Sequence, residues 1–277
     1  MIMKEKSTSL STDSDSKSGY EDEFMSGIPL QSGIIYGPIF SRRLGRSLGI
    51  NLLPIDRKVC TFDCVYCQYG SAKVSDTSVN GAEFPSVSDV LLNIEKALKK
   101  PRTIDYLTFS GNGEPTIHPD FPEIVEGVIS LRERLRPDAK LAILSNSSRV
   151  DQPSIHAALE RFDLPMMKLD AGDPQTFQAI NRPAKSIDFW EIVAGLGSIP
   201  NLMVQSMLID GKVSNMRGDA YHAWVDLLIE LRPRETHIYS LARPTACDGV
   251  ELVNPQMIQR IAAELWEHHQ LLVKAFF

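Results

Sequence analysis

From Gly33 onward, short apolar runs alternate with longer stretches in which apolar residues recur at helical spacing. The runs are rich in β-branched and other apolar residues, which is typical of strands buried on both faces. Six runs have this character: Ile50–Leu53, Tyr106–Phe109, Leu141–Leu144, Met166–Leu169, Leu202–Ile209 and His237–Leu241. Amphipathic stretches lie between and after them, so the pattern predicts six strand–helix units in succession.

Two of the predicted helices carry clear start signals. Ser86 with Asp89 forms a capping-box-like start for one helix, and Pro101 ends it. Asn254 and Pro255 occupy the cap and the first helical position of the last helix. Successive strand–helix units favour parallel strands joined by right-handed crossovers. Since a closed TIM barrel has eight units, the sheet is either an incomplete barrel or an open doubly wound sheet.

The beginning of the chain differs from the rest. It is rich in Ser, Lys, Asp and Glu, and such a segment buries too little apolar surface to offset its chain entropy. We therefore expect a disordered polar tail over residues 1–30 and one core domain over residues 31–277. The tail lacks the apolar centre of a signal peptide, and no apolar run approaches the length of a membrane span, so we expect a cytoplasmic protein.

The balance of charge argues against a nucleic-acid partner. The 277-residue chain carries a net charge of −6, so it has no overall basic field to attract RNA. A local basic patch remains open, because Arg42, Arg43 and Arg46 form a short basic segment. This segment could face an anionic substrate, a phosphate backbone or solvent, and solvent is the commonest surrounding of a short charge run.

Three of the four cysteines, Cys60, Cys64 and Cys67, fall within eight residues in the loop after the first predicted strand. In a reducing compartment this C-x3-C-x2-C spacing indicates a metal centre rather than disulfides. Structural zinc normally takes four protein ligands, and the neighbouring sequence offers no fourth Cys or His. A cubane cluster held by three thiolates would leave one iron free for a substrate or cofactor. A zinc site, or an iron–sulfur electron carrier with a fourth ligand, remains an alternative.

This spacing, with the aromatic Tyr66 before the third cysteine, resembles the cluster motif of the radical S-adenosylmethionine (SAM) superfamily. The resemblance implies a 4Fe–4S cluster on Cys60, Cys64 and Cys67, whose unique iron chelates SAM, and it places Tyr66 near the adenine. It implies an enzyme that cleaves SAM reductively into methionine and a 5′-deoxyadenosyl radical, which takes hydrogen from a substrate. An external donor of the flavodoxin or ferredoxin type would supply the electron. We accordingly expect an α/β fold, a partial (β/α)6 TIM-like barrel of parallel strands with the cluster at its C-terminal mouth.

A second motif, Gly111, Asn112, Gly113 and Glu114, follows the second predicted strand. Glycines at a strand end let the backbone approach a ligand closely. The segment resembles the GGE motif of radical SAM enzymes, which implies that its backbone and Glu114 hold the SAM amino group. Asn112 interrupts the glycine pair, so the motif is a variant. It lies on the same face as the cysteine loop, where parallel α/β folds carry their sites.

Polar residues also end the later strands on this face. Asn146 follows the third strand, Lys168 and Asp170 the fourth, Gln205 lies in the fifth, and Arg243 follows the sixth. By the resemblance, Asn146, Asp170 and Gln205 are candidates for binding the SAM ribose and carboxylate. Lys168, Asp170 and Arg243 are the candidate catalytic residues, since Lys and Arg suit a carboxylate or phosphate on the substrate. Capping, loop hydrogen bonds or a structural ion-pair network are the alternatives.

Further segments resemble one group of stand-alone radical SAM proteins, similar to the radical SAM core of the tRNA wybutosine-synthesising enzyme. They are Tyr36–Gly49, Gln68–Gly70, Lys168–Asp173 and Asn181–Pro183. The tRNA enzyme carries a second cluster on additional cysteines, whereas here only Cys247 remains, and one thiolate cannot hold a cluster. The acidic net charge also fits tRNA poorly. We therefore predict radical chemistry on an unidentified substrate, with an RNA-base-modifying enzyme as an alternative.

Overall fold

The computed structural model describes residues 28–70, 84–242, 245 and 247–277. Its main sheet has eight strands in the order β1-β2-β3-β4-β5-β6-β8-β10, and a small separate sheet pairs β7 with β9. The pair β1–β2 is antiparallel, and every later neighbouring pair of the main sheet is parallel. The strands are β1 (Ile35–Ser41), β2 (Gly45–Ile50), β3 (Tyr106–Phe109), β4 (Lys140–Ser145), β5 (Leu164–Lys168), β6 (Met203–Met207), β7 (Ile209–Gly211), β8 (Glu235–Tyr239), β9 (Val250–Leu252) and β10 (Val273–Phe276).

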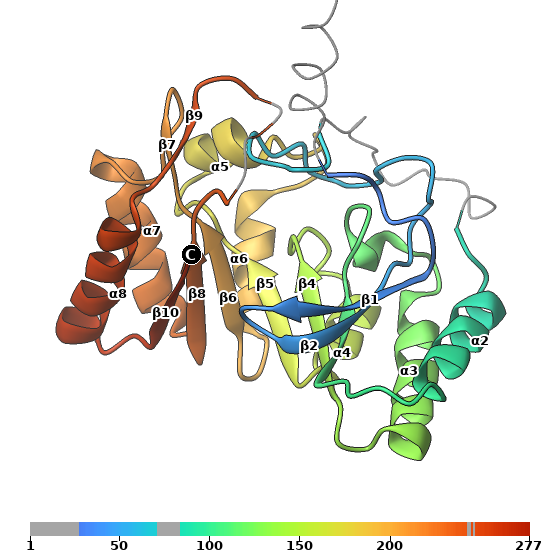
Figure 1. Cartoon of the computed structure of the whole chain (residues 1–277). Helices are drawn as coiled ribbons and strands as arrows, with labels where there is room; N and C mark the ends of the chain where they lie inside the picture. The colour runs from blue at the N-terminus through green and yellow to red at the C-terminus, as the bar shows by residue number, and fades with distance from the viewer. Residues whose placement is uncertain (1–27, 71–83, 243–244, 246) are drawn as a thin grey trace, which may run out of the picture.

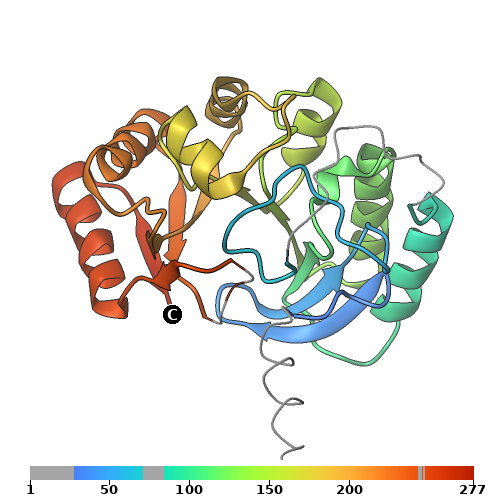
Figure 2. The ribbon, with the colours of Figure 1, turned by 90° about the horizontal axis from the view of Figure 1, so that it is seen from above.

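Most of the helices lie on the convex side of the main sheet, which curls into an open arc (Figure 1, Figure 2). The described helices are α2 (Val87–Leu98), α3 (Phe121–Leu135), α4 (Pro153–Leu159), α5 (Pro174–Asn181), α6 (Phe189–Gly197), α7 (Gly218–Leu231) and α8 (Pro255–His269), with the short 3-10 helix η2 (Pro115–Ile117). An open doubly wound sheet would carry helices on both faces. The predicted partial barrel of parallel strand–helix units is therefore confirmed.

The strands at the two edges of the sheet were not among the predicted runs. In β1 and β2, Gly, Pro, Ser and Arg interrupt the apolar residues, and β1 exposes most of its middle to solvent. Strand β10 is short and only partly buried, because it lies at the other edge. The first predicted strand, Ile50–Leu53, is displaced: β2 ends at Ile50, and the buried Leu53 packs against Val59 of the cysteine loop instead.

The predicted helix starts are confirmed. Ser86 Oγ accepts a hydrogen bond from the Asp89 N–H at 3.1 Å and begins α2, while Asn254 Oδ1 accepts from the Gln256 N–H at 2.8 Å and begins α8. Both helices then bury their apolar stripe in the core between the sheet and the helical layer, where Trp224 of α7 is also fully buried. This packing fixes the strand ends, and hence the loops that follow them.

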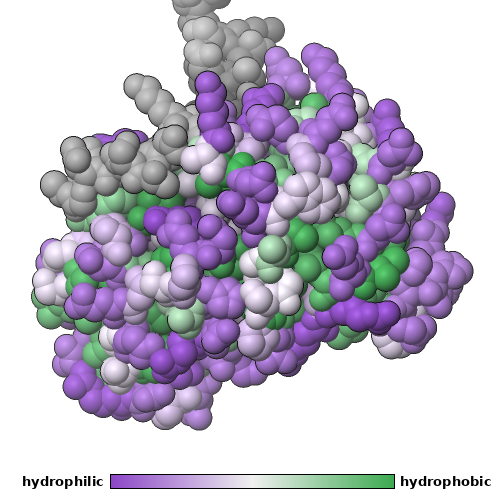
Figure 3. Space-filling model, turned by 180° about the vertical axis from the view of Figure 1, so that it is seen from behind, coloured by the Kyte–Doolittle hydropathy of each residue, from purple (hydrophilic) through white to green (hydrophobic). Residues whose placement is uncertain are grey.

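Of the predicted tail, residues 1–30, the first 27 residues lie outside the described part of the chain. From there the chain meets the cysteine loop, since the Ile28 N–H donates to the Gln68 carbonyl at 2.8 Å. Among the helices that the structure describes, none has the length and apolar character needed to cross a membrane. Hydrophilic residues cover much of the face turned away from the β1–β2 hairpin, with hydrophobic residues showing in patches between them (Figure 3).

Candidate active site

The cysteine loop, residues 51–70, follows β2 and crosses the open top of the arc (Figure 2). Cys60 is buried, Cys64 and Cys67 are partly buried, and all three thiols are free. The loop contains no helix, and its only β-pairing consists of isolated bridges at Val59 and Phe62. Its backbone groups therefore need hydrogen-bond partners from other parts of the chain. Two segments distant in sequence, residues 111–114 and 180–184, supply them.

The 111–114 turn holds the start of the loop. The Val59 N–H donates to the Asn112 carbonyl at 2.9 Å, and the Val59 carbonyl accepts from the Glu114 N–H at 3.1 Å. Gly113 has a φ of +143°, and a Cβ atom there would lie 1.7 Å from the Val59 oxygen. The fully buried Asn112 side chain also donates to the Gln31 and Pro54 carbonyls, which ties the turn to the segments before Val59. In this structure the turn is a clamp on the loop, and its predicted contact with SAM stays a prediction.

Residues 180–184 hold the middle of the loop. The Asp63 N–H donates to the Asn181 carbonyl at 3.1 Å, and the Val65 N–H donates to the Ile180 carbonyl at 3.0 Å. Helix α5 ends at Asn181, and Arg182 follows in the left-handed region with a φ of 45°. The last carbonyls of a helix have no partner within it, so here they accept the N–H groups of the loop. This gives a structural reason for the Asn-Arg-Pro sequence at the end of α5.

Two asparagine side chains point their amides at cysteine sulfurs. Asn146 Nδ2 lies 3.5 Å from Cys60 Sγ, and Asn181 Nδ2 lies 3.4 Å from Cys64 Sγ. The Asn146 amide also donates to the Thr61 hydroxyl at 2.9 Å, which fixes its orientation. Hydrogen bonds to the sulfurs are among the features that tune iron–sulfur clusters. Asn146 and Asn181 therefore both lie at the cysteine loop, and the predicted contact of Asn146 with SAM stays a prediction.

The charge around the thiols fits a bound cluster. Burial raises the pKa of the Cys60 thiol to about 12 and that of Cys64 to about 11. Binding to iron removes those protons and leaves thiolates in a buried place. Lys58 lies beside them with its side chain almost fully buried. Burial alone would lower the pKa of Lys58, but the Cys67 and Cys60 thiols raise it, so Lys58 is a cation placed against the negative charge that a thiolate-bound cluster brings.

Asp170 is the centre of a buried network below the loop. Its Oδ2 accepts hydrogen bonds from the Tyr66 hydroxyl and from Asn181 Nδ2, the latter at 2.7 Å, and its Oδ1 lies 3.5 Å from Lys168 Nζ. Lys168 also donates to the Tyr239 hydroxyl at 3.1 Å. Burial alone would lower the pKa of Lys168, but Asp170 and Tyr239 outweigh it and raise the pKa. The charges of Lys168 and Asp170 thus compensate each other, as a structural ion pair would, and their predicted catalytic role stays a prediction.

Gln205 of β6 lies on the same side of the sheet. Its Oε1 accepts from Arg43 Nη1 at 2.9 Å, and its Nε2 donates to the Met166 carbonyl at 2.9 Å. The Arg43 guanidinium also lies 4.7 Å from the centre of the Tyr239 ring. Since Arg43 belongs to the turn between β1 and β2, its side chain reaches across the open side of the barrel to β6 and β8.

Glu114 is fully enclosed by donors from its own chain. Its Oε1 accepts from the Thr116 N–H at 3.1 Å, the Thr116 hydroxyl at 2.7 Å and the Ser145 hydroxyl at 2.9 Å, and its Oε2 accepts from the Asn146 N–H at 2.5 Å. Burial raises the pKa of this carboxyl. The side chain caps η2 and ties it to the end of β4 through Ser145 and Asn146. Asn146 is also the residue whose amide lies near Cys60 Sγ.

We expect Glu114→Ala to lower the free energy of unfolding by about 3 kcal/mol or more, because it leaves several buried donors without an acceptor. Chemical denaturation of the cluster-free protein measures this, with Glu123→Ala on the exposed side of α3 as a matched control. Equal stabilities of the two variants would contradict the capping role. A loss of SAM affinity without a loss of stability would instead support the predicted contact with the SAM amino group.

Two further arginines belong to this part of the chain. Arg243 lies outside the described residues, so its predicted catalytic role stays a prediction. Arg182, which follows α5, is exposed, and its Nη1 lies 3.8 Å from Cys247 Sγ.

Three residues have roles that the sequence left unassigned. Asn181 stands in the motif that ends α5, where a helix end before a proline signals free carbonyls and a turning chain. Lys58 lies two residues before Cys60, and a basic residue beside clustered cysteines was the available signal. For Arg43 no signal in the sequence distinguishes it from Arg42 and Arg46, because only the fold shows which of them points into the barrel.

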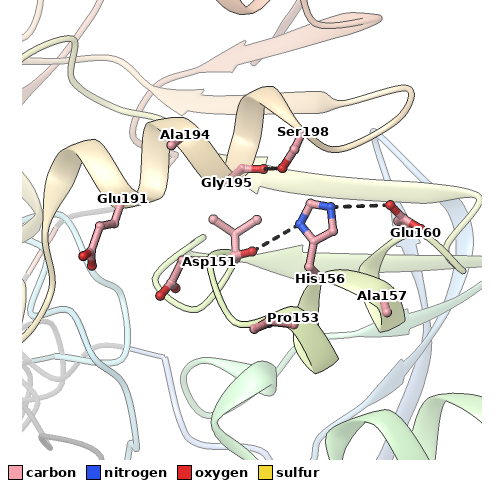
Figure 4. A pocket seen from close by; sticks show the side chains of 10 residues that line it. Asp151, Pro153, His156, Ala157, Glu160, Glu191, Ala194, Gly195 and Ser198 are labelled. Atoms are coloured by element: carbon pink, nitrogen blue, oxygen red, sulfur yellow. Dashed lines mark hydrogen bonds and ion pairs between the residues drawn. The ribbon is translucent and has the colours of Figure 1, made fainter.

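A hollow of about 560 Å³ lies elsewhere, between α4 and α6 (Figure 4). His156 points into it, but its Nδ1 lies 3.2 Å from the Val150 carbonyl and its Nε2 lies 3.4 Å from Glu160. Both ring nitrogens are thus engaged by groups of the chain, and no cysteine lines the hollow. With its imidazole engaged and the three clustered cysteines elsewhere, the hollow is not our candidate active site.

Comparisons with known proteins agree with the geometry. The sequence profile of the Radical SAM superfamily matches residues 57–217, which include the three clustered cysteines and the two segments that hold their loop. A UPF0026 protein of Methanocaldococcus jannaschii is 31% identical over 237 residues, which cover 83% of this chain and 70% of that protein. A protein of Brachyspira hyodysenteriae named GTPase Obg is 36% identical over 60% of this chain, and the match covers only 23% of its length.

Solved structures show the same fold at low sequence identity. A radical SAM methyltransferase from Sphaerobacter thermophilus superposes with a TM-score of 0.59 at 14% identity, covering 86% of this chain and 67% of that one. TYW1 with a bound lysine–pyruvate adduct superposes with a TM-score of 0.50 at 18% identity, covering 80% and 74%. The chain therefore belongs to the radical SAM superfamily, whose enzymes use a 4Fe–4S cluster and SAM, and to the UPF0026 family.

Proposed function

We propose that Cys60, Cys64 and Cys67 hold a 4Fe–4S cluster with which this enzyme cleaves SAM reductively and abstracts hydrogen from a substrate. Bound to these cysteines and reduced, the cluster would supply the one electron needed to cleave SAM into methionine and a 5′-deoxyadenosyl radical, and that radical would take a hydrogen atom from the substrate. The observation that carries the proposal is the clamped cysteine loop, which supplies three thiols and aims the amides of Asn146 and Asn181 at two of them.

SAM would lie between this loop and the strand ends. We assign its amino group to Glu114 and the backbone of residues 111–113, its adenine to Tyr66, and its ribose and carboxylate to the region of Asn146, Asp170 and Gln205, to which the three contribute differently. The partly exposed Asn146 offers the most direct contact. Buried Asp170 acts by holding Tyr66 through their shared hydrogen bond. Gln205 is engaged by Arg43, which it orients.

The donor set favours this proposal over the zinc alternative. A structural zinc ion normally takes four protein ligands, and the cysteine loop offers three cysteines with no fourth Cys or His beside them in the sequence. A cluster held by three thiolates would leave one iron free to bind SAM.

The electron donor and the substrate follow from the same proposal. The donor would be an external protein of the flavodoxin or ferredoxin type, in a reducing compartment such as the cytoplasm, where thiols stay free. An RNA base remains the second candidate substrate. It is supported by the sequence resemblance to the radical SAM core of the tRNA wybutosine-synthesising enzyme, and the net charge of −6 weighs against it.

The test is anaerobic reconstitution with iron and sulfide, followed by reduction with dithionite in the presence of SAM. We expect 5′-deoxyadenosine and methionine in equal amounts, measured by mass spectrometry, and an electron paramagnetic resonance signal of the reduced cluster that changes when SAM is added. If the protein holds a full cluster but its electron paramagnetic resonance signal does not change with SAM and no 5′-deoxyadenosine forms, it would be an electron carrier instead.

A further inference from the structure

A cleft of about 460 Å³ opens where the two edges of the curled sheet approach each other. Residues from both edges and from the cysteine loop line it, among them Phe40, Arg42, Arg43, Gln68, Met207 and Tyr239. Its volume is in the range of sites for small organic molecules. The cleft adjoins the proposed radical site, because Gln68 directly follows Cys67 and the Met207 N–H donates to Asp170 Oδ1 at 2.7 Å.

The charge in this cleft is not compensated. Arg42 and Arg43 are its charged lining residues, and in the described part of the chain neither arginine has a carboxylate within 4.0 Å. Elsewhere the chain pairs its cations: Lys168 lies 3.5 Å from Asp170, and Arg46 of the same hairpin lies 2.7 Å from Asp105. A partly buried cation without a counter-charge is unfavourable unless a ligand supplies one.

The surroundings of Arg43 orient it without neutralising it. Its partners are the Gln205 amide oxygen at 2.9 Å and the face of the Tyr239 ring at 4.7 Å, and both are uncharged. They hold the planar guanidinium in one place, so little rotamer freedom is lost when an oxyanion binds to its remaining N–H groups. Phe40, which is 82% exposed, and Met207 add apolar surface to the same cleft.

We infer that this cleft is the substrate site of the proposed radical SAM activity, and that it takes an organic anion. The anionic group, a carboxylate or a phosphate, pairs with the Arg43 guanidinium, while Arg42 at the rim adds a second positive charge. The apolar body of the substrate lies against Phe40 and Met207. Calling the bound anion a substrate rests on the proposed function, whereas anion binding to the cleft can be tested without any SAM cleavage.

The test measures the binding of benzoate and phenyl phosphate to the reconstituted full chain by calorimetry, with benzamide as the neutral match. Benzoate, phenyl phosphate or both should bind, and benzamide should not. Arg43→Gln should weaken binding about tenfold or more, because a hydrogen bond to a charged group contributes about 1.5–3 kcal/mol. Arg46→Gln, which removes a charge of the same hairpin outside the cleft, should leave the affinity unchanged. The tighter of the two probes identifies the anionic group.

Several outcomes overturn the inference. Benzamide binding as tightly as benzoate and phenyl phosphate would show that charge is not recognised, and equal effects of Arg43→Gln and Arg46→Gln would show that the anion binds elsewhere. Should Arg43→Gln fail to fold, the exposed Arg42→Gln replaces it, and an unchanged affinity there overturns the inference as well. Anion binding at Arg43 by a protein that forms no 5′-deoxyadenosine would leave the site standing and remove the proposed function alone.

Discussion

Replacement of Cys60, Cys64 or Cys67 by Ala is expected to abolish cluster binding, from about four iron atoms per chain to fewer than one. Each thiolate would ligate its own iron, and the loop offers no spare sulfur: the three positions are held apart by the backbone clamps at Val59 and at residues 61–65. Iron and sulfide content, and the electron paramagnetic resonance signal after reduction, measure the loss. Production of 5′-deoxyadenosine should disappear with it.

Cys247→Ala is the matched control. Cys247 is also partly buried and packs against the apolar cluster around Tyr66, but it comes from a segment far along the chain and contacts Arg182. It should keep the full iron content, since three thiolates suffice for a radical SAM cluster. Loss of the cluster in Cys247→Ala would reveal a fourth protein ligand and favour the electron-carrier alternative. A full cluster in all three single variants of the loop would refute the assignment itself.

The fold could be predicted where one physical rule dominates. Runs such as Leu141–Leu144 and Met166–Leu169 are buried on both faces, so hydrophobicity alone marks them as strands. Strand β1 was not predicted because an edge strand exposes one side, and β2 was not predicted because Gly, Arg and Ser interrupt its apolar residues although most of it is buried. Displacement of the first strand has a related cause: Leu53 is apolar because it packs under a loop, and hydrophobicity does not distinguish the two kinds of burial.

The candidate site, like the fold, could be predicted only in part. Spacing alone identifies Cys60, Cys64 and Cys67, because metal ligation requires particular side chains close together in sequence. Position at a strand end identifies Asn146 and Asp170, but not what they touch. An ion pair between Lys168 and Asp170, two residues apart, was among the alternatives that the sequence allowed. The reach of Arg43 across the barrel depends on the curvature of the sheet, which is not a local property, so it could not be predicted from the sequence.

Gly113→Ala is expected to lower the free energy of unfolding by about 3–5 kcal/mol. Two effects add there. A φ of +143° is a conformation that L-residues rarely adopt, and the new Cβ would lie 1.7 Å from the Val59 carbonyl oxygen, a backbone atom that cannot rotate away. Relief requires the loop to move off the turn, which breaks the hydrogen bonds from Val59 to Asn112 and from Glu114 to Val59. Chemical denaturation of the cluster-free chain measures the change.

Gly218→Ala is the control for a positive φ without a steric contact. Gly218 has a φ of +51°, in the left-handed region, and a Cβ atom added there would meet nothing within 4 Å, so this variant carries only a modest backbone strain, about 1 kcal/mol. The larger loss in Gly113→Ala should come from the contact with Val59 and the stronger strain at a φ of +143°, and it should be accompanied by a lower iron content, because Cys60 directly follows the displaced residue. Gly218→Ala should reconstitute fully. If both variants lost the same small amount of stability and kept their iron, the turn could not be what holds the cysteine loop in place.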